Sequence, residues 1–385
     1  MSRCSALSGL GGLEFGDLGR RSRWSLCRAQ RGPPVSECTD GLSSKLGLVE
    51  SGAVALKKAV WQKSTLWAEE TSMPLRRNLI LMAVWCLGLL SIGLADDPVR
   101  KKVLFIGIDG CRHDAVVAAN TPHIDRLIET GTRFVGTDIL SPKRSDDANT
   151  VSGPGWSNLL TGVWPNKHGV GNNRFLLPKY DDYPHFFARA KEAQPTLKTA
   201  SFSDWGPIAD NILRASDHTV SLPADGADDY TSKDAELAAA CSQHLQSADP
   251  DLVFLYLGQV DERGHGFGFH PTVKQYVTGI ENVDRHIGQV LSAIQSRPKR
   301  AQEDWLVLIG TDHGGAGTDH GDGHSNPDIQ RTFLIVSGAA AEVNAPQKPT
   351  YQVDIVATAL THMGVALRPE WKLDGQPVGL KPISQ

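Results

Sequence analysis

Disulfide frameworks and long apolar runs are both missing from this chain of 385 residues, and each absence excludes a class of protein. Of its six cysteines, only Cys111 and Cys241 follow residue 96, so one disulfide is conceivable but a disulfide-stabilised scaffold is not. The apolar run at residues 79–90 has twelve residues, fewer than the ~20 that span a bilayer. We therefore expect a globular fold that depends on a hydrophobic core.

Basic residues are too few to balance the acids. The whole chain has a formal net charge of −4, and residues 96–385 contain 27 Lys or Arg against 36 Asp or Glu, a net charge of −9. A protein that binds a nucleic acid polymer needs a basic surface, so we expect no such partner.

The first 95 residues differ from the rest of the chain. Residues 1–72 are rich in Ser, Arg, Gly and Cys and show no sustained helical or strand period. A second start follows, in which Met73 opens a basic segment, residues 79–90 are apolar, and small residues at 93–95 precede two aspartates. This order is typical of a secretory signal peptide.

We therefore expect residues 1–72 to lie outside the native protein, which would start at Met73, and residues 73–95 to be a removed signal peptide. Residues 96–385 would form a single domain of an exported protein, periplasmic or secreted, without stable membrane insertion. Trp85 is too bulky for the position ahead of a lipidated Cys86, which argues against a lipid anchor. The alternative is a genuine tail of 72 residues ahead of an anchor helix.

Three apolar runs are each followed by an acid, and two of them by histidines as well. The runs and the residues that follow them are 103–108 with Asp109, 252–260 with Asp261 and His265, and 305–311 with Asp312 and His313. Such runs are typical of buried strands in an open α/β sheet, whose ligands gather beyond the carboxyl ends of the strands. Asp and His together predict a metal site, and nitrogen ligands favour zinc over magnesium or calcium. The pattern therefore predicts a metal-dependent hydrolase.

Helical and strand patterns alternate along the domain. Thr121 and Pro122 are typical of a helix start, and Gly131 of its end, while residues 271–297 carry apolar positions at helical spacing. Residues 332–337 form a further apolar strand pattern. We expect an α/β fold with a mostly parallel sheet sandwiched between helices.

A candidate nucleophile lies between the first and second acid-bearing runs. Residues 153–155 are Gly-Pro-Gly, which suits a tight turn, and residues 156–161 suit a short helix, so Ser152 would lie just ahead of a helix N-terminus. That position favours an anion such as phosphate, and a metal ion could activate the serine hydroxyl. Ser152 could also be a simple N-cap, and Thr150 and Ser157 are rival hydroxyls.

Four motifs, in order, resemble the type I phosphodiesterase and nucleotide pyrophosphatase family of the alkaline phosphatase superfamily. They are Ile-Gly-Ile-Asp109-Gly, Ser152-x-Pro followed by Leu-Leu-Thr-Gly-x-x-Pro-x-x-His168-Gly, Asp261-x-x-Gly-His265, and Asp312-His313-Gly-Gly followed by His320-Gly. The resemblance covers residues 101–338 and implies an alkaline-phosphatase-like core in the domain at 96–385.

The resemblance implies two divalent metal ions, usually zinc, and a small phosphorylated substrate. By position, one ion would be held by Asp109, Ser152, Asp312 and His313, and the other by Asp261, His265 and His320, with His324 as the alternative to His320. Ser152 would be the catalytic residue and would form a phosphoserine intermediate. The sequence departs from the family at Gly155, where diesterases of this branch commonly have an Asn that contacts a phosphoryl oxygen.

Several alternatives stay open. The same ligands serve a phosphomonoesterase or a phosphonate hydrolase, whereas a sulfatase motif would need an Arg at Trp156, and a non-catalytic binding protein should lack a ligand or the nucleophile. Arg112 could bind a substrate oxyanion, although a salt bridge to Asp114 or Asp138 is the simpler expectation. Trp205 could offer an aromatic platform to a substrate or could simply pack.

The expected signal peptide leads to a first prediction. Cleavage after the small residues at 93–95 should leave a native protein whose intact mass corresponds to a chain that begins at or near Asp96. A mature product that retains residues 1–72 would contradict this.

Overall fold

A computed structural model describes residues 99–143 and 148–382, all of which belong to one compact unit, Leu94–Gln385. The expected upstream segment, residues 1–72, and the expected signal peptide, residues 73–95, lie outside the described residues. Within the described part, none of the helices has the length and apolar character that a bilayer crossing requires.

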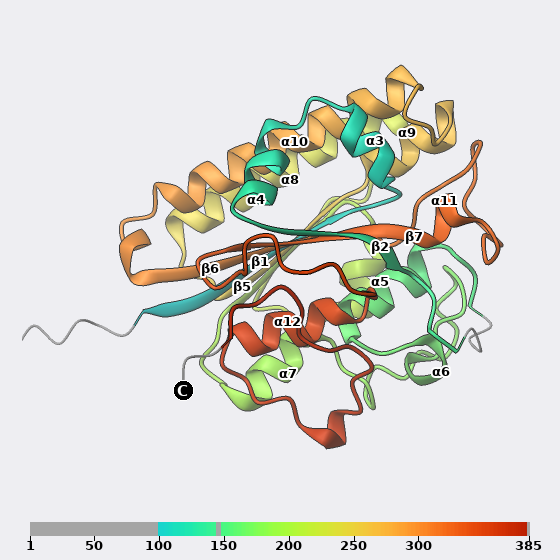
Figure 1. The fold of residues 1–385 in the computed structure, drawn as a ribbon. Helices are drawn as coiled ribbons and strands as arrows, with labels where there is room; N and C mark the ends of the chain where they lie inside the picture. Colours follow the sequence, from blue (N-terminus) through green and yellow to red (C-terminus); the bar gives the residue numbers. More distant parts are fainter. Residues whose placement is uncertain (1–98, 144–147, 383–385) are drawn as a thin grey trace, which may run out of the picture. The chain divides into compact units, whose positions relative to one another are not determined.

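Seven strands form one sheet in the order β2-β7-β6-β1-β5-β3-β4 (Figure 1). All are parallel to one another except β7, which is antiparallel to both of its neighbours. The mostly parallel sheet predicted from the sequence is thus confirmed. The strands are β1 (Arg100–Ile108), β2 (Gly131–Asp138), β3 (Thr199–Ser203), β4 (His218–Ser221), β5 (Leu252–Leu257), β6 (Glu303–Gly310) and β7 (Arg331–Gly338).

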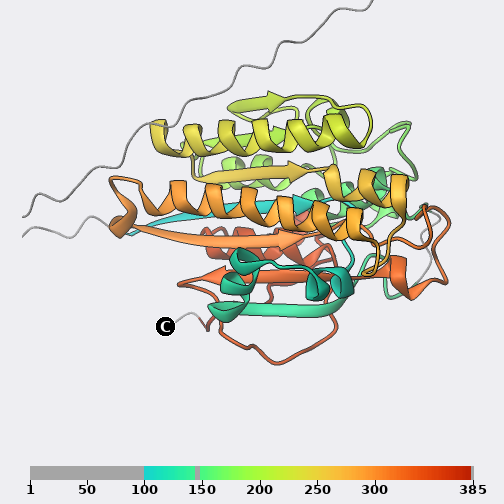
Figure 2. The same cartoon turned by 90° about the horizontal axis from the view of Figure 1, so that it is seen from above.

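Helices cover both faces of the sheet (Figure 1). One face carries α3 (His113–Ala118), α4 (Pro122–Glu129), α8 (Ala227–Ser247), α9 (Gln259–Phe267) and α10 (Lys274–Gln295). The other carries α5 (Ser152–Thr161), α7 (Phe186–Ala193) and α12 (Asp354–His362), and two short helices, α6 (Pro165–His168) and α11 (Pro327–Gln330), lie in connections. Seen from above, α8 and α10 run side by side along the strands (Figure 2).

The central strands are buried on both faces because their side chains alternate between two hydrophobic cores. In β1, Val103 and Phe105 join the core under α5, α7 and α12, whereas Leu104, Ile106 and Ile108 join the core under α4, α8 and α10. The same alternation continues in β5 and β6. This explains why the runs at 103–108, 252–257 and 305–310 are apolar throughout.

Two expected element boundaries were wrong. Ser152 is the first residue of α5, and the Gly-Pro-Gly segment at 153–155 forms the first helical turn instead of a tight turn ahead of it. Proline is tolerated there because the first N–H groups of a helix have no intrahelical acceptor. Likewise, β5 ends at Leu257, so Asp261 lies in the first turn of α9 and shares a helix face with His265 four residues later.

The strand order explains why the acids meet. Strand β1 lies between β5 and β6 and is parallel to both, so the segments that follow these strands begin at one edge of the sheet. Gly107 leaves room there for the ring of Trp156 from α5, because a Cβ atom at this position would overlap that ring. The indole ring of Trp156 can therefore lie next to Asp109.

This close approach leads to a stability prediction. Gly107→Ala should displace the Trp156 ring and lower the free energy of unfolding by about 1–3 kcal/mol, the usual cost of overpacking a core. Gly171→Ala is a matched control, since a Cβ atom there meets nothing within 4 Å. Chemical denaturation of both variants would test this, and equal stability of the two would contradict it.

Candidate metal and nucleophile site

The first cluster at this sheet edge contains Asp109, Asp312 and His313. Asp109 follows β1, and Asp312 and His313 follow β6. The Nε2 atom of His313 lies 3.1 Å from Asp312 Oδ2 and 3.5 Å from Asp109 Oδ1. All three residues are buried, and one ligand atom from each could surround a single ion.

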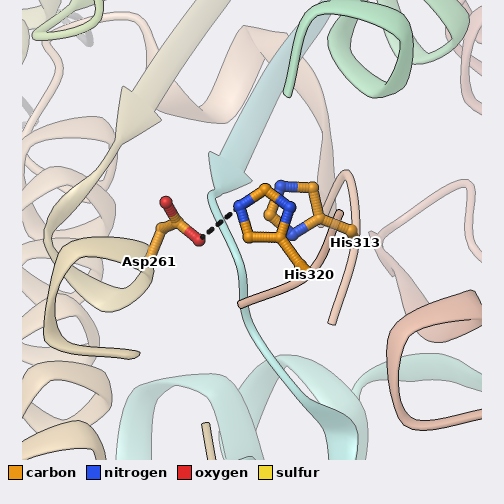
Figure 3. Close-up of side chains that lie close together, drawn as sticks. All are labelled: Asp261, His313 and His320. Atoms are coloured by element: carbon orange, nitrogen blue, oxygen red, sulfur yellow. Dashed lines mark ion pairs between the residues drawn. The ribbon is translucent and has the colours of Figure 1, made fainter. Parts of the chain in front are cut away.

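The second cluster is centred on Asp261 and reaches into the first. His265 Nε2 lies 3.3 Å from Asp261 Oδ2, His320 Nε2 lies 3.6 Å from Asp261 Oδ1, and the two Nε2 atoms are 3.0 Å apart. The His313 and His320 rings stack with centroids 3.6 Å apart, as Figure 3 shows beside Asp261. Asp261, His313 and His320 also form a possible ligand group, so His313 lies between the two clusters.

Each of the three aspartates presents a buried oxygen that accepts no hydrogen bond from the residues that the structure describes. These atoms are Asp109 Oδ1, Asp261 Oδ1 and Asp312 Oδ2. An unpaired buried carboxylate oxygen costs free energy, so three of them converging on three imidazole nitrogens fit bound cations. The mixed oxygen and nitrogen donor set suits zinc or a similar divalent ion.

The histidines are oriented by backbone carbonyls. The Nδ1 atoms of His265, His313 and His320 lie 2.9 Å from the carbonyl oxygens of Thr318, Gly314 and Thr150, respectively. If each Nδ1–H donates to its carbonyl, each Nε2 is left as a lone-pair donor that faces the clusters. This is the arrangement that metal-binding histidines usually adopt.

Two aromatic side chains that the sequence reasoning missed hold Asp109. Trp156 Nε1 donates a hydrogen bond of 2.9 Å to Asp109 Oδ2, and the Tyr256 hydroxyl donates to the same oxygen. Both rings are fully or almost fully buried. The sequence contained one signal for this contact, Gly107, which leaves room for the indole ring because it has no side chain. Only the packing shows that this room is used by Trp156.

Burial and the neighbouring charged groups shift the pKa values of the three carboxylates in opposite directions. Burial, reinforced by the charge of Asp261, raises the pKa of Asp109 to about 7, and burial raises the pKa of Asp312 well above its usual range. Burial also acts to raise the pKa of Asp261, but the hydrogen bond with His265 and the nearby histidines outweigh it and lower that pKa. The same hydrogen bond raises the pKa of His265 to about 9.

Ser152 is the hydroxyl that faces the clusters. Its Oγ atom lies 3.5 Å from His313 Nε2, at the first residue of α5. The rivals are engaged elsewhere: Thr150 Oγ1 donates to the His320 carbonyl and accepts from Gly323 N, and Ser157 Oγ bonds the Gly153 carbonyl and Tyr180. The N-cap position is occupied by Val151, so Ser152 does not cap this helix.

A pocket of about 150 Å³ opens over Ser152 and the clusters. Asn173 lines it and accepts a hydrogen bond of 2.6 Å from Gly153 N through Oδ1, which leaves its NH₂ group available to a ligand. A residue with a side chain at position 155 could not place an amide in the pocket, because its Cβ atom would crowd Asp312. An amide therefore does lie beside Ser152, from a position that the motif comparison did not indicate.

Arg112, which could have bound a substrate oxyanion, is not among the residues that line the pocket. Its guanidinium pairs with Asp114 and Asp328 and donates to the carbonyl oxygens of Phe269 and Gly315. All of these partners lie outside the pocket lining, so Arg112 anchors the segment after His313. The salt bridge to Asp114 was the simpler expectation, and it is present.

Trp205 does line the pocket. It is half-buried, stacks on Tyr256 with centroids 6.3 Å apart, and contacts Phe175 at 5.9 Å. The Trp205 side chain therefore packs against its neighbours and also borders the pocket.

His324 does not point toward the clusters, because its Nε2 atom lies 2.7 Å from the Ala148 carbonyl oxygen. Cys111 and Cys241 are free, buried thiols and do not pair.

Most of the described part of the chain is similar to known proteins. A family model described as type I phosphodiesterase / nucleotide pyrophosphatase matches residues 103–372. Mouse ectonucleotide pyrophosphatase/phosphodiesterase family member 7 is 22% identical over 260 residues, covering 62% of this chain and 55% of that protein. The chain spans at most 56% of the length of the five curated relatives it matches.

Two solved structures show the same fold. Murine ectonucleotide pyrophosphatase/phosphodiesterase 5 has a TM-score of 0.51 at 14% identity, covering 69% of this chain and 95% of that chain. A 2-O GAG sulfatase has a TM-score of 0.55 at 15% identity, covering 72% of this chain and 73% of that chain. At such identities the likeness concerns the fold alone, and it confirms the predicted alkaline-phosphatase-like core.

The geometry leads to a prediction about metal content. His265→Ala or His320→Ala should each lower the bound zinc from about two ions per chain to about one, because each removes an Nε2 donor from the second cluster. His324→Ala is the matched control and should retain both ions. Elemental analysis of the purified variants would test this, and loss of metal on changing His324 but not His320 would contradict the assignment.

Proposed function

Because the chain belongs to the type I phosphodiesterase / nucleotide pyrophosphatase family, we propose that it is a metal-dependent hydrolase of phosphoric esters, of the phosphodiesterase type. One observation carries this proposal: three unpaired carboxylate oxygens and three imidazole Nε2 atoms converge beside Ser152. A fold kept only for binding would not require a hydroxyl at the helix start that faces this cluster.

Two divalent cations, zinc by the donor set, would fill the site. The first would be held by Asp109, Asp312 and His313 with the Ser152 hydroxyl. The second would be held by Asp261, His265 and His320, with His313 close to both. When bound, such ions lower the pKa of a coordinated hydroxyl and offset negative charge on phosphoryl oxygens.

Ser152 would act as the nucleophile. Its Oγ atom gives up its proton to solvent and forms the new bond to phosphorus while the bond to one ester oxygen breaks, and the departing alcohol takes up a proton from solvent. The N-terminus of α5 presents its positive end to the phosphoryl group, and the free NH₂ of Asn173 can donate to a phosphoryl oxygen. Water then cleaves the phosphoserine, which releases a phosphomonoester and restores the hydroxyl.

Neighbouring side chains serve to keep this constellation rigid. Trp156 and Tyr256 hold Asp109, and the Thr150 hydroxyl ties the loop of His320 to the segment before Ser152. Trp156 also argues against sulfatase chemistry despite the shared fold, because it occupies the position of the arginine in the sulfatase motif and donates to Asp109 instead.

The proposed substrate is a small phosphorylated molecule, which the volume of the pocket and its polar lining support. The acidic balance of residues 96–385 speaks against a nucleic acid polymer. The signal-peptide-like pattern of residues 73–95 supports an exported, periplasmic or secreted, enzyme.

The nucleophile gives the decisive prediction. Ser152→Ala should keep the fold and most of the bound zinc, yet lower kcat for bis-para-nitrophenyl phosphate by a factor on the order of 10³ or more, because the attacking oxygen is lost. Steady-state kinetics on the zinc-loaded protein would measure this.

Thr150→Val and Ser157→Ala are controls, because each removes a nearby hydroxyl whose role is to form hydrogen bonds within the protein. In both variants kcat should fall far less than in Ser152→Ala. Ser152→Thr should retain measurable activity because it keeps a hydroxyl. Near wild-type turnover by Ser152→Ala would show that water attacks directly and would overturn the phosphoserine mechanism.

A further inference from the structure

Two buried acids, Asp204 and Asp234, lie outside both metal clusters and take no part in the proposed chemistry. Asp204 follows β3 and Asp234 lies in α8. Both residues are 0% exposed, and neither makes an ion pair with any residue that the structure describes. Two acids buried without a cation would destabilise the fold if both were charged, so their arrangement requires a physical explanation.

Asp234 holds the start of α9. Its Oδ1 atom accepts a hydrogen bond of 2.9 Å from Gly258 N, and its Oδ2 atom accepts from the backbone N and the side-chain Nε2 of Gln259. Gly258 is the N-cap residue of α9 and has no side chain that could accept from the first N–H groups, so a carboxylate of α8 does this instead. Its negative charge also suits the positive end of the helix dipole.

Asp204 lacks such donors. No N–H or O–H group of another described residue donates to either of its oxygens, although both atoms are buried. Its carboxyl group instead forms a hydrogen bond with that of Asp234. The two groups converge on Gly258, whose N–H bonds Asp234 and whose Cβ position, if it were occupied, would lie 3.0 Å from Asp204 Oδ1. Two carboxylates cannot bond each other without a proton, so one of the pair is protonated.

The proton belongs on Asp204. The three N–H hydrogen bonds that Asp234 accepts favour its charged form, whereas Asp204 accepts none from other described residues. Burial, reinforced by the charge of Asp234, raises the pKa of Asp204 well above its usual range. The other titratable groups around it include Tyr230, Tyr256 and Asp109. Burial raises the pKa of both tyrosines, which stay neutral, and Asp109 adds negative charge that further disfavours ionised Asp204.

We propose that Asp204 and Asp234 are positioning residues, in which a protonated Asp204 donates to the Asp234 carboxylate and this carboxylate fixes the start of α9. The first turn of α9 carries Asp261, and His265 follows one turn later on the same face. The pair therefore holds two ligands of the proposed second cation in place. The inference rests on the proposed metal site and adds to it a support that belongs to neither ligand set.

The same substitution at the two positions should have opposite effects on zinc binding. In Asp204→Asn an amide N–H replaces the carboxyl O–H, so the donor to Asp234 is kept and zinc affinity should match that of the wild type. In Asp234→Asn an NH₂ group meets N–H donors at the start of α9. The weaker-bound zinc should then have a dissociation constant at least about 10-fold higher, a loss typical of groups that orient metal ligands. Competition with a chelator measures both constants.

Asp251→Asn controls for lost stability alone. Asp251 is a buried acid that precedes β5, at the opposite end of that strand from Gly258, and it pairs with Arg100 and Lys102. Its replacement should destabilise the fold and leave both zinc dissociation constants unchanged. Weaker zinc binding in Asp204→Asn, or zinc binding in Asp234→Asn equal to that in Asp251→Asn, would overturn the positioning role.

The shared proton is tested by the pH dependence of unfolding. An unfolded chain releases it near about pH 4, whereas the folded protein keeps it, so wild-type stability falls as the pH rises toward the raised pKa of Asp204. From pH 6 to pH 8, the unfolding equilibrium constant of the wild type relative to Asp204→Asn should rise about tenfold per pH unit, because the amide has no proton to release. Chemical denaturation of the zinc-loaded proteins measures this ratio.

A ratio that does not change with pH would overturn the shared proton, whatever the zinc affinities are. If the wild type neither binds zinc nor hydrolyses bis-para-nitrophenyl phosphate, the proposed function fails and the positioning role fails with it. The pH-dependent ratio, measured without zinc, would then still distinguish a pair that shares a proton from two independent acids.

Discussion

The confinement of three carboxylates at one buried edge of the sheet is the constraint on which the site depends. Asp109, Asp261 and Asp312 each keep an oxygen without a hydrogen-bond partner among the described residues, in an interior where unbalanced charge is costly. Burial raises the pKa of Asp109 and of Asp312, which means that their charged forms are disfavoured at this edge. Bound cations would offset the repulsion, which would couple metal binding to the stability of this edge.

The scaffold aims these groups at one another through rigid elements. Strand β1 ends between β5 and β6, α9 presents Asp261 and His265 on one face, and backbone carbonyls hold each imidazole by Nδ1. Trp156 extends from α5, which begins at Ser152, to Asp109, so α5 and the first cluster are linked directly. Gly107 makes that link possible because it has no side chain.

The pocket is lined by residues from segments that lie far apart in sequence. Ser152 and Asn173 line it together with Trp205, Tyr230 and Glu262. Tyr256 also lines it, bonds Asp109 and stacks on Trp205, so it links the first cluster to the aromatic part of the pocket.

The sequence alone determined the sheet strands that are buried on both faces, the order of the motifs and the identity of the charged residues that follow β1, β5 and β6. Those signals are local, since they depend on apolar runs and on the residue next along the chain. Only the tertiary structure decided which hydroxyl faces the cluster, that Arg112 anchors a loop, that His324 bonds a carbonyl, and that Asn173 and Glu262 share one pocket. Those outcomes depend on contacts between segments far apart in sequence, and no local pattern encodes where such side chains point.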